Sequence, residues 1–167
     1  TTSNLGADVT TSGTQTYTRA VTLSANNTLT TTSNGNVSFG STTNGAQTLS
    51  ITTDGTGDVT FTDDVGGSAG LNGLTISTND FNAVDLKVGG IISITNTGTS
   101  SDITGVIAND GDAAAFTKAG AGILTVSGTN THTGITTISA GTLSISADAG
   151  LGSVSGLDAD RLTFNGG

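Results

Sequence analysis

The sequence predicts an all-β protein folded as a β-solenoid, a single segment over residues 1–167 with roughly eight coils of about 20 residues each. Two observations carry this prediction. The β-branched residues Thr, Val and Ile make up 56 of the 167 residues, and the chain contains no Glu and no Met. β-Branched side chains lose rotamer freedom in a helix and fit a pleated strand. The apolar residues also keep a regular phase, unlike those of a disordered Gly- and Ser-rich chain.

A unit of three residues (apolar, then Ser or Thr, then apolar) predicts the strands. Because strand side chains alternate between two faces, each unit directs two apolar side chains inward and one hydroxyl outward. The units are Val21-Thr22-Leu23, Val37-Ser38-Phe39, Leu49-Ser50-Ile51, Val59-Thr60-Phe61, Leu74-Thr75-Ile76, Ile92-Ser93-Ile94, Leu124-Thr125-Val126, Leu143-Ser144-Ile145 and Leu162-Thr163-Phe164. Residues that tolerate positive φ predict turns at Asn34-Gly35-Asn36, Asn44-Gly45-Ala46, Asp54-Gly55-Thr56-Gly57-Asp58, Gly66-Gly67-Ser68 and Asn72-Gly73.

The spacing of these units favours a solenoid over a sandwich of hairpins. Leu124, Leu143 and Leu162 start successive units at equal steps of 19 residues, which is close to the length expected for one coil. The shorter steps that lead to Leu49 and to Val59 also fit hairpins locally. The long alternating strands of hairpin sandwiches are missing, however. Residues 97–115 lack the unit, and we expect a looser coil or an outward loop there.

Composition and charge exclude several classes of function. The net charge is −9, so nucleic acid and anionic membranes are poor partners. The basic residues are Arg19, Lys87, Lys118 and Arg161. Without Cys the chain has no disulfide, no Cys-bearing zinc site and no c-type haem attachment. No apolar run is long enough for a transmembrane helix or a signal-peptide core. We expect no cofactor.

Residues capable of catalysis or metal binding are few. His132 is the single imidazole, and Gly152-Ser153-Val154-Ser155-Gly156 is out of register for a nucleophile elbow, so we expect His132 to fill an aromatic position of the solenoid. An acidic site of the kind used by β-helical polysaccharide lyases would need Lys87 to approach Asp64 from an adjacent coil. The weak calcium candidates are Asp54, Asp58, Asp63 and Asp64. Their spacing matches neither an EF-hand nor the calcium-binding nonapeptide, and solvated turns explain them more simply.

Rows of Thr suggest a different kind of binding. A flat Thr-x-Thr ladder on one face of a solenoid orders water and binds ice. Candidate pairs occur in Thr14-Gln15-Thr16-Tyr17-Thr18, Thr28-Leu29-Thr30 and Thr60-Phe61-Thr62. An ice-binding face needs the same pair at one position of every coil, and these pairs recur at uneven intervals. The simpler interpretation is that Thr is an uncharged residue suited to solvent-facing strands.

Residues 116–145 read Phe-Thr-Lys-Ala-Gly-Ala-Gly-Ile-Leu-Thr-Val-Ser-Gly-Thr-Asn-Thr-His-Thr-Gly-Ile-Thr-Thr-Ile-Ser-Ala-Gly-Thr-Leu-Ser-Ile. This segment resembles the passenger-associated transport repeat, also called the autotransporter-associated β-strand repeat. The matching positions are Lys118, Gly120, Gly122, Leu124, Val126, Gly128, Asn130, Thr133, Gly134, Thr136, Ala140, Gly141, Thr142 and Leu143. His132 stands where the family has Tyr or Phe, and Ile135 stands where it has a small residue.

A looser resemblance links the rest of the chain to filamentous-haemagglutinin-like exoproteins. It rests on Gly35-Asn36-Val37-Ser38-Phe39, on Gly57-Asp58-Val59-Thr60-Phe61 and on Asn44-Gly45-Ala46-Gln47-Thr48-Leu49. The two resemblances imply a right-handed parallel β-helix from a secreted or surface-displayed protein of a Gram-negative-type bacterium. They imply no catalytic residue and no cofactor in the repeats.

These observations predict a structural module rather than an enzyme. We expect a stiff extracellular rod or self-assembling filament used for surface projection or adhesion. Its partners are then copies of itself, by end-to-end stacking or strand complementation, or flanking repeats of a longer chain. The alternative is an adhesin segment that binds a host or matrix glycan on one polar face. The small number of aromatic residues, one Tyr and five Phe, counts against a glycan site.

Overall fold

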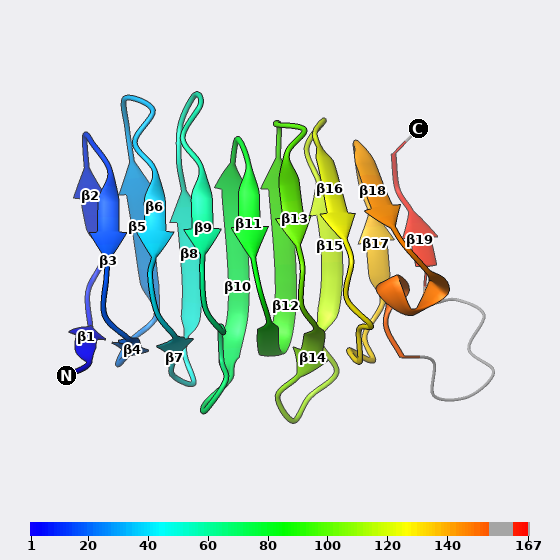
Figure 1. The fold of residues 1–167 in the computed structure, drawn as a ribbon, viewed down its shortest axis with the longest axis horizontal. Helices are drawn as coiled ribbons and strands as arrows, with labels where there is room; N and C mark the ends of the chain where they lie inside the picture. Colours follow the sequence, from blue (N-terminus) through cyan, green and yellow to red (C-terminus); the bar gives the residue numbers. More distant parts are fainter. Residues whose placement is uncertain (154–161, 167) are drawn as a thin grey trace.

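The computed structural model describes residues 1–153 and 162–166, and it shows a parallel β-solenoid (Figure 1). Every strand pairing in this part of the chain is parallel, and the paired strands come from successive coils. The prediction of a solenoid is therefore confirmed, since a hairpin sandwich would pair neighbouring strands antiparallel. The described residues contain almost no helix, only the 3₁₀ turn η1 (Asp148–Leu151).

The strands form three sheets that run along the solenoid. The nine-stranded sheet comprises β2 (Val9–Thr11), β5 (Asn27–Thr31), β8 (Thr48–Thr52), β10 (Leu71–Thr78), β12 (Leu86–Asn96), β14 (Ile107–Asn109), β15 (Ala115–Ala119), β17 (Thr136–Ile138) and β19 (Leu162–Phe164). The seven-stranded sheet comprises β3 (Gln15–Tyr17), β6 (Val37–Phe39), β9 (Val59–Phe61), β11 (Phe81–Ala83), β13 (Ser101–Ile103), β16 (Ile123–Val126) and β18 (Thr142–Ile145). A short third sheet comprises β1 (Ser3–Leu5), β4 (Val21–Leu23) and β7 (Thr43–Asn44).

The coils at the start of the stack are slightly longer than the sequence predicts. Thr16 and Ser38 pair in register and stand 22 positions apart in the sequence. The described residues make about seven turns, one for each strand of the seven-stranded sheet. In Figure 1 the nearer strands point down and the fainter strands behind them point up as the chain advances from left to right, which makes the coil right-handed.

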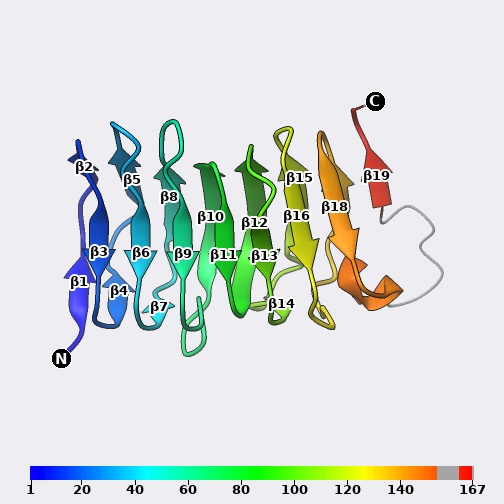
Figure 2. The same ribbon diagram turned by 45° about the horizontal axis from the view of Figure 1, so that its top comes forward.

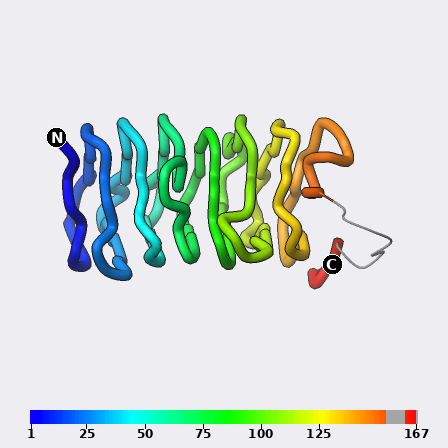
Figure 3. The backbone as a smooth tube through the Cα atoms, turned by 90° about the horizontal axis from the view of Figure 1, so that it is seen from below, coloured from blue at the N-terminus to red at the C-terminus, as the bar shows by residue number. Residues whose placement is uncertain are grey.

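The successive coils lie side by side along one axis, with the two ends of the chain at opposite ends of the stack (Figures 2 and 3). The interior is a single apolar column. In seven of the nine predicted units, both apolar side chains are buried. These units run from the one with Val21 and Leu23 to the one with Leu124 and Val126. The last two pairs are not: Leu143 and Ile145 are half-buried, and Leu162 and Phe164 are exposed, because their strands lie at the end of the described stack.

Stacked aromatic rings occupy the core of the first coils. The ring centroids of Tyr17 and Phe39 are 4.8 Å apart, and those of Phe39 and Phe61 are 4.5 Å apart. Phe81 continues the stack edge-on, with its centroid 6.2 Å from that of Phe61. The in-register pairing of β3, β6 and β9 places the first three rings above one another, so the length of the sequence repeat sets these ring contacts directly.

Most predicted turns are present. Asn34, Gly45, Gly55 and Gly66 have positive φ, as corner residues of these types allow. The turn predicted at Asn72-Gly73 is wrong, because both residues lie within β10, where the register shifts between Leu71 and Gly73. The irregular region 97–115 is in part an ordinary coil, since it contains β13 and β14. Its outward loop is confirmed at 110–113, where Gly111 and Asp112 are exposed.

Candidate functional surfaces

Two of the four predicted calcium ligands, Asp54 and Asp58, accept hydrogen bonds from backbone groups of neighbouring coils. The two carboxylate oxygens of Asp54 accept hydrogen bonds from the backbone N–H groups of Asn34 (2.7 Å) and Ser33 (3.0 Å) in the preceding coil. Ser33 and Asn34 both have positive φ, so Asp54 caps a strained corner. In return, Asn34 Oδ1 accepts a hydrogen bond from Thr56 N–H at 3.0 Å.

Asp58 belongs to a ladder that continues toward later coils. Asn36 Oδ1 accepts from Asp58 N–H at 2.8 Å, Asp58 Oδ1 accepts from Asp80 N–H at 3.0 Å, and Asp80 Oδ1 accepts from Ser100 N–H at 2.9 Å. Each carboxylate or amide thus satisfies a backbone donor one coil further on. This ladder explains why Asp and Asn recur at one corner, and it depends on the fold rather than on a ligand.

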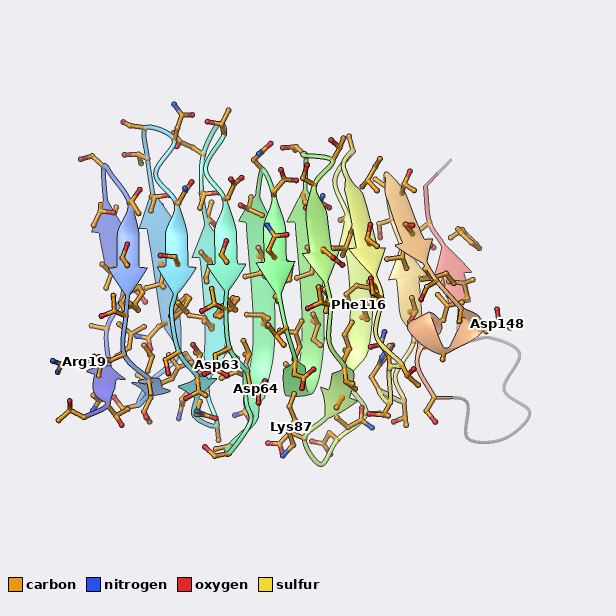
Figure 4. All side chains as sticks on the ribbon, viewed as in Figure 1. Arg19, Asp63, Asp64, Lys87, Phe116 and Asp148 are labelled. Carbon is orange, nitrogen blue, oxygen red and sulfur yellow. The ribbon has the colours of Figure 1, made fainter. Side chains whose placement is uncertain are left out.

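Asp63 and Asp64 lie beyond the opposite end of β9 from Asp58 (Figure 4). Asp63 Oδ1 accepts a hydrogen bond from Asp64 N–H at 2.9 Å. In the described ranges 1–153 and 162–166, no group of three or more His, Cys, Asp or Glu residues is arranged to hold a metal ion. The four predicted ligands are therefore distributed over the coil, with Asp54 and Asp58 already accepting backbone hydrogen bonds.

The structure brings Lys87 and Asp64 to one surface hollow of about 220 Å³, which Asp85 also lines. Adjacent coils thus place together the basic and acidic residues that an acidic catalytic site would need. Lys87 and Asp85 have structural partners, however. Asp85 Oδ1 accepts a hydrogen bond from Val106 N–H at 2.6 Å, and Lys87 Nζ lies 2.8 Å from Asp110 Oδ1. The hydrogen bond from Lys87 lowers the pKa of Asp110 below its ordinary value.

His132 lies fully buried inside the solenoid, tilted against Phe116 with ring centroids 6.1 Å apart. Its Nε2 is 3.0 Å from Thr136 Oγ1, and its backbone carbonyl accepts a hydrogen bond from Ser153 N–H at 2.9 Å. The ring therefore occupies a core aromatic position, as the sequence predicts. Most of the stretch considered as a nucleophile elbow, residues 154–156, lies outside the described residues.

Lys118 is a core residue that the sequence reasoning did not identify. Its side chain is fully buried in the column between Ile94 and Ile138. Nζ donates hydrogen bonds to the carbonyl oxygens of Ala119 (2.6 Å) and Gly120 (2.9 Å) and approaches Ala140 O in the next coil (3.4 Å). Burial lowers the pKa of this ammonium. The signal was present in the sequence, because Phe116-Thr117-Lys118 has the alternation of a strand unit with Lys at an inward position.

The aromatic side chains do not form a platform for sugar rings. Phe39, Phe61, Phe81 and Phe116 are buried, and Tyr17 is half-buried with its hydroxyl donating to Gln15 Oε1 at 3.0 Å. The exposed aromatic side chain among the described residues is Phe164, on the last strand of the stack. Most of the aromatic side chains that could stack on a sugar ring are therefore buried in the solenoid.

Residues 116–145 match the family model of the passenger-associated-transport-repeat. The match begins within β15, runs through β16 and β17 and ends with the last residue of β18. The match and the parallel solenoid together fit a passenger β-helix repeat over this segment. Passenger-associated-transport-repeats occur in the passenger domains of autotransporters. In this chain the repeat contributes two strands to each large sheet, and it contains the buried Lys118 and His132.

No curated protein and no solved structure gives a significant match to the chain. Among the described residues there is no helix long and apolar enough to cross a membrane.

Proposed function

We propose that this chain is a structural module of an autotransporter-type passenger, a stiff rod segment displayed on the bacterial surface. The observation that carries the proposal is the combination of a passenger repeat with one uninterrupted parallel stack. Each coil adds about 4.8 Å to the rod, and the seven described turns therefore extend it by roughly 34 Å. The carboxylates and amides at the corners join successive coils, which suits a stiffening role rather than catalysis.

The solenoid is extended by further coils that pair with β19. Leu162 and Phe164 occupy inward positions of β19, paired with Thr136 and Ile138, and they are 37% and 67% exposed. A further coil, from a flanking repeat or from a second copy, covers these side chains and completes the apolar column. The partner of this module is thus another β-solenoid coil.

Surface display tests the proposal. The chain is fused in place of the passenger of an autotransporter translocator and expressed in a Gram-negative host, and exposure is measured by antibody labelling and protease treatment of intact cells. The expected result is surface labelling with a folded, protease-resistant module. Retention inside the outer membrane, or rapid degradation at the surface, would contradict the proposed role. Phe164→Asp is expected to leave display intact while weakening association of purified copies in sedimentation experiments.

A further inference from the structure

The outward side of the nine-stranded sheet carries two aligned rows of hydroxyl residues. The first row contains Thr28, Ser50, Thr75, Ser93, Thr117, Thr137 and Thr163, each paired with the next in register. The second row lies two residues further along each strand and contains Thr10, Thr30, Thr52, Ser77, Thr95 and then Ala119. Together these rows form what we call the hydroxyl face.

The pairs recur at one position of successive coils, although their sequence intervals are uneven. The step from Ser50 to Thr75 is longer than the step from Thr28 to Ser50, and the step from Thr75 to Ser93 is the shortest of the three. The loops between the sheets absorb these differences, so the strands remain in register. The uneven intervals that counted against a Thr ladder in the sequence are therefore no argument against it in the fold.

The hydroxyl groups of this face have no hydrogen-bond partner among the described residues. All the row residues with hydroxyls are exposed or half-buried, and none of their side chains takes part in a hydrogen bond within residues 1–153 and 162–166. Each hydroxyl can donate one hydrogen bond and accept two, so the rows present a regular set of free donors and acceptors.

The seven-stranded sheet shows that this arrangement is not a general property of the solenoid. Its equivalent outward row runs Thr16, Ser38, Thr60, Asn82, Asp102, Thr125 and Ser144. Asn82 and Asp102 interrupt the hydroxyls, and Ser38 Oγ donates to Thr16 Oγ1 at 3.4 Å. Ser127 Oγ also donates to Asp102 Oδ1 at 3.4 Å. The two sheets therefore provide a test face and a control face in one molecule.

From Thr28 onward the rows of the hydroxyl face are uncharged, and the charged group at their start is Asp8, whose Oδ1 accepts a hydrogen bond from Thr28 N–H at 2.7 Å. A third outward row, on the other side of the first, contains Thr48, Gly73, Ile91 and Ala115. Ile91 is 61% exposed, and Ile135, whose carbonyl accepts a hydrogen bond from Phe116 N–H, is 49% exposed. From Thr28 onward, none of the described residues of the three rows is charged or aromatic. A charged peptide therefore finds no ion-pair partner along the rows beyond Asp8, and a sugar ring finds no aromatic plane to stack on.

The geometry points to crystalline water as the ligand, and we propose that the hydroxyl face binds the surface of ice. Parallel strands set the spacing between coils at about 4.8 Å, and two residues along a strand set the spacing between rows at about 6.6 Å. Both distances are close to oxygen repeats on the faces of hexagonal ice. Free hydroxyls at such spacings hydrogen-bond an ordered water layer, and the Thr methyl groups with the Ile side chains fit between the water molecules.

Partition into growing ice tests the proposal. The labelled full chain is mixed with an inert globular protein, a polycrystalline ice hemisphere is grown slowly from the solution, and the label in the ice is compared with that in the liquid. Enrichment in the ice is expected for the wild type. Thr75→Lys with Ser93→Lys, on the hydroxyl face, is expected to reduce incorporation to that of the inert protein. Ser38→Lys with Thr60→Lys, on the seven-stranded sheet, is expected to leave it unchanged.

Circular dichroism melting tests whether both double variants remain folded. If the Thr75 and Ser93 substitutions prevent folding, the single variant Ser77→Tyr serves in their place, since it adds bulk at an outward position without adding charge. Exclusion of the wild type from ice would overturn the proposal. Equal loss from both faces, or retention on microcrystalline cellulose with exclusion from ice, would also overturn it.

Discussion

Replacing Phe39 with Ala removes the central ring of the aromatic stack. Phe39 is fully buried and lies 4.8 Å from the Tyr17 ring and 4.5 Å from the Phe61 ring, measured between centroids. Truncating a buried Phe costs about 3–5 kcal/mol through lost transfer free energy and the cavity that remains. Because Phe39 stacks on two rings and each aromatic pair contributes about 0.5–1.5 kcal/mol beyond burial, we expect a loss of stability near the upper end of that range. A loss of about 4–5 kcal/mol is a large part of a typical folding free energy of about 5–15 kcal/mol.

Urea unfolding followed by far-ultraviolet circular dichroism measures this loss. Phe164→Ala is the matched control, because Phe164 is 67% exposed and its truncation is expected to change the free energy of unfolding by less than about 0.5 kcal/mol. A loss below about 1 kcal/mol for Phe39→Ala, or equal losses for the two variants, would refute the assignment of the stack to the core.

Three further predictions concern buried groups. Ile51→Asp buries an unpaired carboxylate in the column between Leu29 and Ile76 and is expected to abolish the cooperative thermal transition; wild-type melting would contradict the inward assignment. Burial raises the pKa of Tyr17, so its ultraviolet absorbance titration is expected above the ordinary value of 10.0, with folding stability falling as the pH rises beyond that value. Burial lowers the pKa of Lys118, so between that lowered pKa and 10.5 the unfolded chain binds more protons than the folded chain. In this pH range the free energy of unfolding, measured relative to that of Lys118→Met, is therefore expected to rise with pH. A pH-independent difference between these two proteins would contradict the Lys118 prediction.

The local alternation of apolar and hydroxyl residues allowed the fold to be predicted from the sequence. The unit at Val37 and Phe39 has a two-residue period, which fixes the inward side chains without knowledge of neighbouring coils. The passenger repeat at 116–145 was also recognisable, because its ordered Gly, Asn and Thr positions lie within one continuous segment.

Features that depend on contacts between coils could not be predicted from the local sequence pattern. Asp54 and Asp58 resemble ligands in the sequence, but their hydrogen-bond partners are backbone groups of neighbouring coils. Lys118 is stabilised by turn carbonyls of its own and the next coil, and the local alternation does not show these contacts. The alignment of Thr28, Ser50 and Thr75 likewise depends on loop lengths that the sequence intervals obscured.

The stacking of coils along one axis is the central claim, and distances between spin labels test it most directly. One label is attached at Thr16 and the second at Asp102, Thr125 or Ser144, which lie four, five and six steps along the same outward row. At about 4.8 Å per coil, the backbone separations are expected to be about 19, 24 and 29 Å, measured by double electron–electron resonance. Separations that do not increase by one equal step per coil would contradict a parallel stack.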